Sequence, residues 1–110
     1  MAYDEALAQR IRAALNDVPG VVEKKMFGGI GFLLQGNMAC GVNGANLIVR
    51  ISPDSYAAAI NQPFVRPFDM TGRPMKGWIL VAPEGVKTKR QLGAWVRRGV
   101  EFARTLPPKG

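Results

Sequence analysis

Three arginines lie seven residues apart near the end of the sequence, at Arg90, Arg97 and Arg104. A spacing of seven nearly completes two helical turns, so on a helix these side chains fall on one face. Arginine donates paired hydrogen bonds to phosphate and carboxylate groups, so this row suits contact with an anionic surface. The alternative is the solvent-exposed side of an amphipathic helix, partly paired with Glu101.

A second group of charged residues, Asp69, Arg73 and Lys76, surrounds residues 71–74. The simplest interpretation is a structural turn with solvated charges. A lysine beside a carboxylate can transfer protons when both are desolvated. Lys76 precedes Gly77 at the edge of a loop, so we expect it to be exposed. Among functional roles, contacts of Arg73 and Lys76 with a partner or a phosphate are therefore favoured over catalysis.

Other chemistry is sparse. The absence of histidine excludes Ser–His–Asp triads, imidazole acid–base catalysis and metal sites that use histidine. Cys40 is the single cysteine and has no histidine to activate it, so it is interpreted as a small buried core residue. The glycines at 28, 29 and 31 fail the dinucleotide pattern, because residue 34 is Leu34 and a strand follows. We therefore expect no enzyme, no metal and no cofactor.

Charge is uneven along the chain. Of 110 residues, 15 are Lys or Arg and 8 are Asp or Glu, a net charge of +7. Residues 1–62 carry five bases and five acids, so the excess lies in residues 63–110, with ten bases and three acids. Such a field attracts polyanions, nucleic acid among them. The alternative is that the charge serves solubility only.

Length and composition predict one domain over residues 1–110. The N-terminus has acids rather than the basic and apolar regions of a secretory signal, and no apolar run could span a bilayer. We expect a cytoplasmic protein with a reduced thiol and no contact with a membrane.

Periodicity and turn signals place the elements that would carry these residues. The fold class is predicted to be α+β, a two-layer domain in which N-terminal, middle and C-terminal helices pack on an antiparallel sheet, a meander plus a second strand pair. Thr88 and Gln91 form a capping box that begins the last helix. The first strand of the second pair contains Pro67, which indicates an edge strand that could support a homodimer. Helices are expected over residues 2–17, 53–60 and 89–106, and strands near 23–27, 30–35, 38–42, 46–51, 65–69 and 76–82.

Several motifs together resemble the N-terminal domain of the TfoX/Sxy family. The matching segments cover nearly all the chain in the same order, and the MFGG and GRPMKGW motifs are the most specific. They are found at residues 25–32, 37–42, 47–50, 68–69, 72–78, 92–96, 102–103 and 106–107.

The resemblance implies a two-layer fold of the kind seen in secretion chaperones, and a non-enzymatic regulatory role. Longer family members regulate natural competence positively and work with the cyclic-AMP receptor protein at promoters of DNA-uptake genes. They carry a second, helical domain, whereas this sequence ends at Gly110. The function expected from the resemblance is a regulatory domain that binds a protein of the transcription machinery. Direct nucleic-acid binding through the basic C-terminal helix is the alternative.

Overall fold

The computed structural model describes residues 3–26, 28–68 and 76–108. It contains three α-helices, six strands and two short 3₁₀ helices in those parts of the chain. The elements are α1 (Glu5–Ala14), β1 (Val21–Met26), β2 (Gly29–Leu34), β3 (Asn37–Asn43), β4 (Asn46–Arg50), η1 (Pro53–Ser55), α2 (Tyr56–Ile60), β5 (Val65–Pro67), β6 (Trp78–Val81), η2 (Pro83–Val86) and α3 (Lys89–Thr105).

All six strands form one antiparallel sheet in the order β1-β2-β3-β4-β6-β5. The first four strands form the expected meander, and the turn at Asn43 and Gly44 joins β3 to β4 with Gly44 at φ 60°. A positive φ is cheap for glycine, which explains why this pair closes the hairpin. The second strand pair joins the meander through β4 and β6, where Ile48 lies opposite Leu80.

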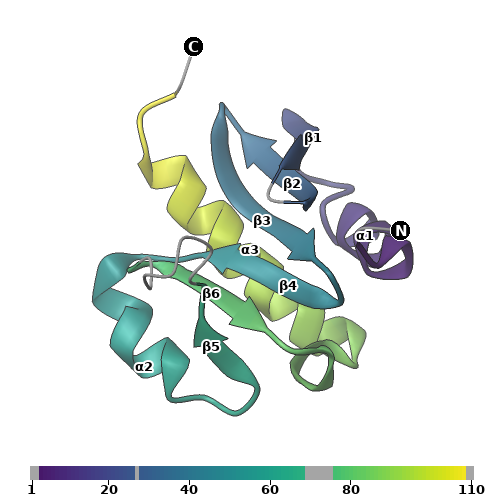
Figure 1. Ribbon diagram of the computed structural model, residues 1–110. Coiled ribbons are helices and arrows are strands. Elements are labelled where there is room, and N and C mark those ends of the chain that lie inside the picture. Colours follow the sequence, from purple (N-terminus) through teal and green to yellow (C-terminus); the bar gives the residue numbers. More distant parts are fainter. Residues whose placement is uncertain (1–2, 27, 69–75, 109–110) are drawn as a thin grey trace.

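The helices cover one face of this sheet, and α3 crosses behind it in Figure 1. Leu7 and Ile11 of α1, Ala59 of α2 and Val96 of α3 belong to the same buried cluster as the strand residues beneath them. Burying an aliphatic side chain of this size stabilises the fold by roughly 1.5–3 kcal/mol. The predicted two-layer α+β fold is confirmed.

The first two helices differ from the sequence prediction at their ends. The α1 helix begins at Glu5, because the side chain of Asp4 accepts a hydrogen bond from the backbone N–H of Leu7 and caps it. It ends at Ala14, and residues 15–17 form a turn. The helix expected over residues 53–60 is divided into the 3₁₀ turn η1 and the short helix α2.

The last helix matches its prediction closely. The hydroxyl of Thr88 accepts from the N–H of Gln91, and the side chain of Gln91 accepts from the N–H of Thr88. This is the expected capping box, and α3 then runs over 17 residues. No helix in the described ranges is long and apolar enough to cross a membrane.

The two edges of the sheet are unequal. The predicted edge strand is present as β5, which has three residues and contains Pro67. At the other edge, β1 has six residues, and Val22 on it is 61% exposed. A homodimer formed through the β5 edge stays a prediction.

Candidate functional site

The helix α3 presents two different faces. Its buried face packs on β3 and β4, while Arg90, Arg97 and Arg104 are exposed. The seven-residue spacing therefore does align these three side chains away from the core, as predicted. The residues of α3 that are buried are Leu92, Trp95, Val96, Gly99, Val100 and Ala103.

Arg90, Arg97 and Arg104, which we call the arginine row, border a groove between α3 and the end of α1. The groove has a volume of about 1110 Å³, and α1 and α3 are in contact beside it. Its wall on α3 carries Lys89 together with all three arginines of the row. The opposite wall is formed by residues 13–18, at the end of α1 and in the turn after it. We call this feature the α1–α3 groove.

The charge in the α1–α3 groove is mainly positive. Four basic side chains line it, against two acidic ones, Asp17 and Glu101. Within the part of the chain that the structure describes, neither Arg90, Arg97 nor Arg104 forms an ion pair. The partial pairing with Glu101 that the sequence suggested is therefore absent from these contacts. The arginine row is open to an anionic partner.

Two contacts hold the elements around the groove in place. The guanidinium of Arg10 donates to the carbonyl oxygen of Val86 over 2.6 Å, which ties α1 to the segment just before α3. On the sheet side, a Cβ atom at Gly99 would collide with the carbonyl oxygen of Ala39. Only glycine permits this approach, so α3 lies directly on the backbone of β3.

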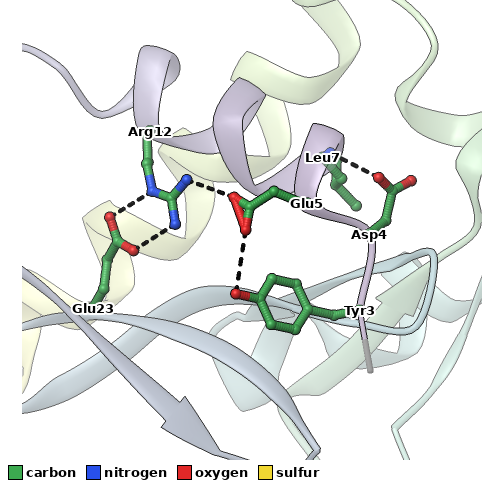
Figure 2. A network of polar contacts seen from close by, with 6 residues as sticks. All are labelled: Tyr3, Asp4, Glu5, Leu7, Arg12 and Glu23. Carbon is green, nitrogen blue, oxygen red and sulfur yellow. Dashed lines mark hydrogen bonds and ion pairs between the residues drawn. The ribbon is translucent and has the colours of Figure 1, made fainter. Parts of the chain in front are cut away.

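A polar network fixes α1 to the edge strand β1, as Figure 2 shows. Arg12 donates from Nε and Nη2 to the two carboxylate oxygens of Glu23, over 2.7 and 2.8 Å. Its Nη1 donates to Glu5 over 2.8 Å, and the hydroxyl of Tyr3 donates to the same carboxylate over 3.3 Å. The hydrogen bonds from Arg12 hold the pKa of Glu23 below its usual range. Arg12 therefore has a structural role.

Two further arginines pack on aromatic rings. Arg98 lies 4.8 Å from the ring centre of Trp95, and Arg50 lies 5.0 Å from Trp78 and 5.6 Å from Phe102. Partial burial lowers the pKa of Arg50. A guanidinium stacked on an aromatic ring is stabilised by the ring's negative face and covers apolar surface. These stacked arginines are less available to a partner than the arginine row.

Of the second predicted cluster, only Lys76 lies within the described residues. Lys76 is exposed, as expected, and lies just before β6, away from the residues that line the groove. Its neighbour Gly77 accepts a hydrogen bond at its carbonyl from the N–H of Ile51 over 2.7 Å. Asp69 and Arg73 lie outside the described residues, so their proposed contacts stay predictions.

The sequence also predicts a buried, unactivated cysteine, turn glycines rather than a nucleotide-binding loop, and no metal site. Cys40 is fully buried, and this burial raises the pKa of its thiol to about 12. Gly28 lies in a turn and Gly29 is the first residue of β2, so a strand follows these glycines rather than a helix. Among residues 3–26, 28–68 and 76–108, no three acidic, cysteine or histidine side chains gather as a metal site would require.

The groove itself could not be found from the sequence. The arginine row gave a signal through its spacing, but residues 13–18 carry no motif that places them beside α3. Their only distinctive feature is small size at Ala13 and Ala14. Their role as a groove wall follows from the packing of two helices that are about 75 residues apart along the chain.

Comparison with protein families supports the resemblance seen in the motifs. The family described as the TfoX N-terminal domain matches residues 13–103 of the 110-residue chain. The chain belongs to the TfoX N-terminal domain family. The match includes Arg90 and Arg97 and ends one residue before Arg104. Comparisons with curated proteins and with solved structures gave no match.

Membership bears on the class of function. The TfoX N-terminal domain family is a family of regulatory, non-enzymatic domains. That description agrees with the expectation from the sequence, where histidine is missing and the single cysteine has no activating base. The α1–α3 groove is thus a candidate interaction surface of a TfoX N-terminal domain.

Proposed function

We propose that this TfoX N-terminal domain regulates transcription by binding a protein of the transcription machinery, with the arginine row of α3 as its contact surface. The observation that carries the proposal is the α1–α3 groove, where Arg90, Arg97 and Arg104 are exposed and form no ion pair within the described residues. Arginine is enriched at protein interfaces, because its planar guanidinium can form two parallel hydrogen bonds with one carboxylate.

The proposal is tested by partner capture at native expression level. A tagged chain is crosslinked in cells, and the proteins recovered are identified and quantified. We expect a transcription component to be enriched with the wild-type chain. The combined change Arg90→Glu, Arg97→Glu and Arg104→Glu should lower its recovery by about tenfold or more, as loss of a charged hot spot does.

The matched control is Lys24→Glu. Lys24 is exposed on β1 and does not line the groove, so this variant changes the net charge without touching the arginine row. Recovery of the transcription component should stay close to the wild-type level. Equal recovery with the triple variant, or no enriched transcription component at all, would show the proposal to be wrong.

Direct nucleic-acid binding is the second candidate, and the alignment of the arginine row favours it specifically. Three exposed arginines on one helix face can contact phosphates of a nucleic-acid backbone. On duplex DNA, the logarithm of the affinity falls with the logarithm of the salt concentration, and each phosphate contact makes this slope steeper by about 0.9. If this candidate is right, fluorescence anisotropy with labelled duplex DNA will give a steep salt slope that the triple variant flattens. Unchanged DNA binding by that variant would exclude the helix as the binding surface.

A further inference from the structure

The lining of the α1–α3 groove combines larger apolar residues (Leu15, Val18, Val96 and Val100) with four small ones, and we call the small ones its floor: Ala13, Ala14, Gly93 and Ala94. Ala13 and Ala94 are exposed, and Ala14 and Gly93 are half-buried. Apart from its two chain neighbours and the backbone of α3 itself, nothing lies within 4 Å of the position that a Cβ of Gly93 would take, so the space above this part of α3 is open. Small residues at a helix surface let another backbone approach closely. The floor therefore fits an apolar stripe of small residues better than a polar chain.

The cations stand along one side of this floor at helical spacing. Seven residues of α-helix rise about 10.5 Å, so Arg90, Arg97 and Arg104 form three positive points at that interval. On a second α-helix that lies along α3, acidic residues placed seven apart have the same spacing as these arginines and can pair with them. A DNA strand carries a charge about every 3.4 Å along its axis and offers no apolar stripe for the floor. The combination of spacing and floor favours a helix as the occupant.

We infer that the α1–α3 groove binds an acidic amphipathic helix of a partner protein. Its acidic residues, seven apart, pair with the arginine row, and its small apolar stripe lies on Gly93, Ala94 and Ala14. This inference rests on the proposed function, because it names the form of partner that the arginine row receives. Helix-in-groove binding of this kind is read through anchors at repeating helical positions.

A second copy of this chain does not fit as the occupant. The first turn of α1 carries Glu5, but the same helix carries Arg10 and Arg12. The α3 helix has one acidic residue, Glu101, among several bases, and the whole chain has a net charge of +7. Like charges brought together across an interface are unfavourable. The complementary charge must therefore come from a different, acidic chain.

The test uses two labelled synthetic peptides of the same 17-residue length as α3. The patterned peptide is an alanine- and leucine-rich helix with glutamates seven residues apart beside an apolar stripe. The control peptide has the same composition, with its glutamates spread around the helix. Fluorescence anisotropy with the full chain at physiological salt should show the patterned peptide binding about tenfold more tightly or better.

Two substitutions, Gly93→Leu and Arg97→Glu, measure the contribution of the floor to binding separately from that of the arginine charges. Gly93→Leu fills the open space above the floor and leaves every arginine in place, so it should weaken the patterned peptide about tenfold or more. Binding of a labelled duplex DNA should change by about twofold at most, because DNA would contact the arginines only. Arg97→Glu should weaken both probes. Circular dichroism checks that each variant is folded, and Ala94→Leu repeats the floor test at an exposed helix position where folding is least affected.

Three results would overturn the inference. Equal binding of the two peptides would show that the arginine row responds to charge without helical pattern. Unchanged peptide affinity in both Gly93→Leu and Ala94→Leu would show that the floor is not used. Absence of peptide binding, with DNA bound in an Arg97-dependent manner, would assign the row to nucleic acid. If the peptide fails while capture of a transcription component in cells still depends on the arginine row, the helix inference falls and the proposed function stands.

Discussion

The arginines of this chain differ in what their guanidinium groups contact. Arg12 is paired with two carboxylates, and Arg10 is bonded to backbone carbonyl groups near the start of α3. Arg50 and Arg98 lie on aromatic rings. The members of the arginine row have none of these contacts within the described residues, and they share one groove. At the residue scale, what distinguishes the arginine row from the other arginines is therefore the set of groups around each guanidinium, since the side chain itself is the same.

The Arg12–Glu23 pair gives a pH-dependent prediction. Its hydrogen bonds lower the pKa of Glu23 in the folded chain. A carboxyl with a lowered folded pKa stabilises the fold above its unfolded pKa, and this contribution is lost as the pH falls through the folded value. Because the Arg12 side chain is 30% and the Glu23 side chain 38% exposed, Glu23→Gln should cost only about 0.5–1 kcal/mol at neutral pH.

Urea denaturation of both proteins across a series of pH values measures this difference. The gap between wild type and Glu23→Gln should be constant near neutral pH and close as acid protonates Glu23. A gap that persists unchanged at acidic pH would mean that the variant is destabilised by something other than the loss of this ion pair.

Cys40 gives a prediction about reactivity. Its burial keeps the thiol protonated, and the thiolate is the reactive form. A disulfide reagent at mildly alkaline pH should therefore label the native chain at least about a hundredfold more slowly than the chain in denaturant, because labelling requires opening of the core. Mass spectrometry over time measures both rates. Rapid labelling of the native chain would contradict the burial of this residue.

At the element scale, two glycines of α3 should respond oppositely to the same substitution. Gly99→Ala places a Cβ against the carbonyl oxygen of Ala39 and should lower the free energy of unfolding by about 1–3 kcal/mol. Gly93→Ala meets open space and gains helix propensity, so it should raise that free energy by up to about 1 kcal/mol. Thermal or chemical denaturation measures both, and each variant is the control for the other. A stabilising Gly99→Ala would refute the close approach of α3 to β3.

The sequence could predict those elements whose signals are local. The capping box at Thr88 and Gln91 is formed entirely by near neighbours, and the turn at Asn43 and Gly44 depends on two residues, so both were predictable. The sequence prediction starts α1 three residues early, because periodicity does not show which residue caps a helix. Asp4 does so through its contact with the N–H of Leu7.

At the scale of the whole molecule, the sequence was less informative. It predicted the arginine row through spacing, because seven-residue alignment is a property of the helix alone. It could not predict the α1–α3 groove, whose walls come from opposite ends of the chain. It predicted that the meander and the second strand pair share one antiparallel sheet, but not that β4 is the strand that pairs with β6. Long-range packing of this kind decides where the arginine row lies.

The family match and the groove support one account at this scale. The chain belongs to a family of regulatory, non-enzymatic domains, which act through what they bind, and its described residues include one groove lined by three aligned arginines that form no ion pair. In the function we propose, the overall charge of +7 attracts an acidic partner from a distance, while the groove determines where that partner binds.

The measurement that tests this claim most directly is site-specific photo-crosslinking in cells. A photoreactive amino acid is placed at exposed position 16, on the groove wall opposite the arginine row, or, as the control, at exposed position 24 on β1. The account predicts that position 16 crosslinks to one acidic protein of the transcription machinery, within a helical segment of that protein, and that position 24 does not. Equal crosslinking from both positions, or crosslinks from position 16 to nucleic acid alone, would contradict it.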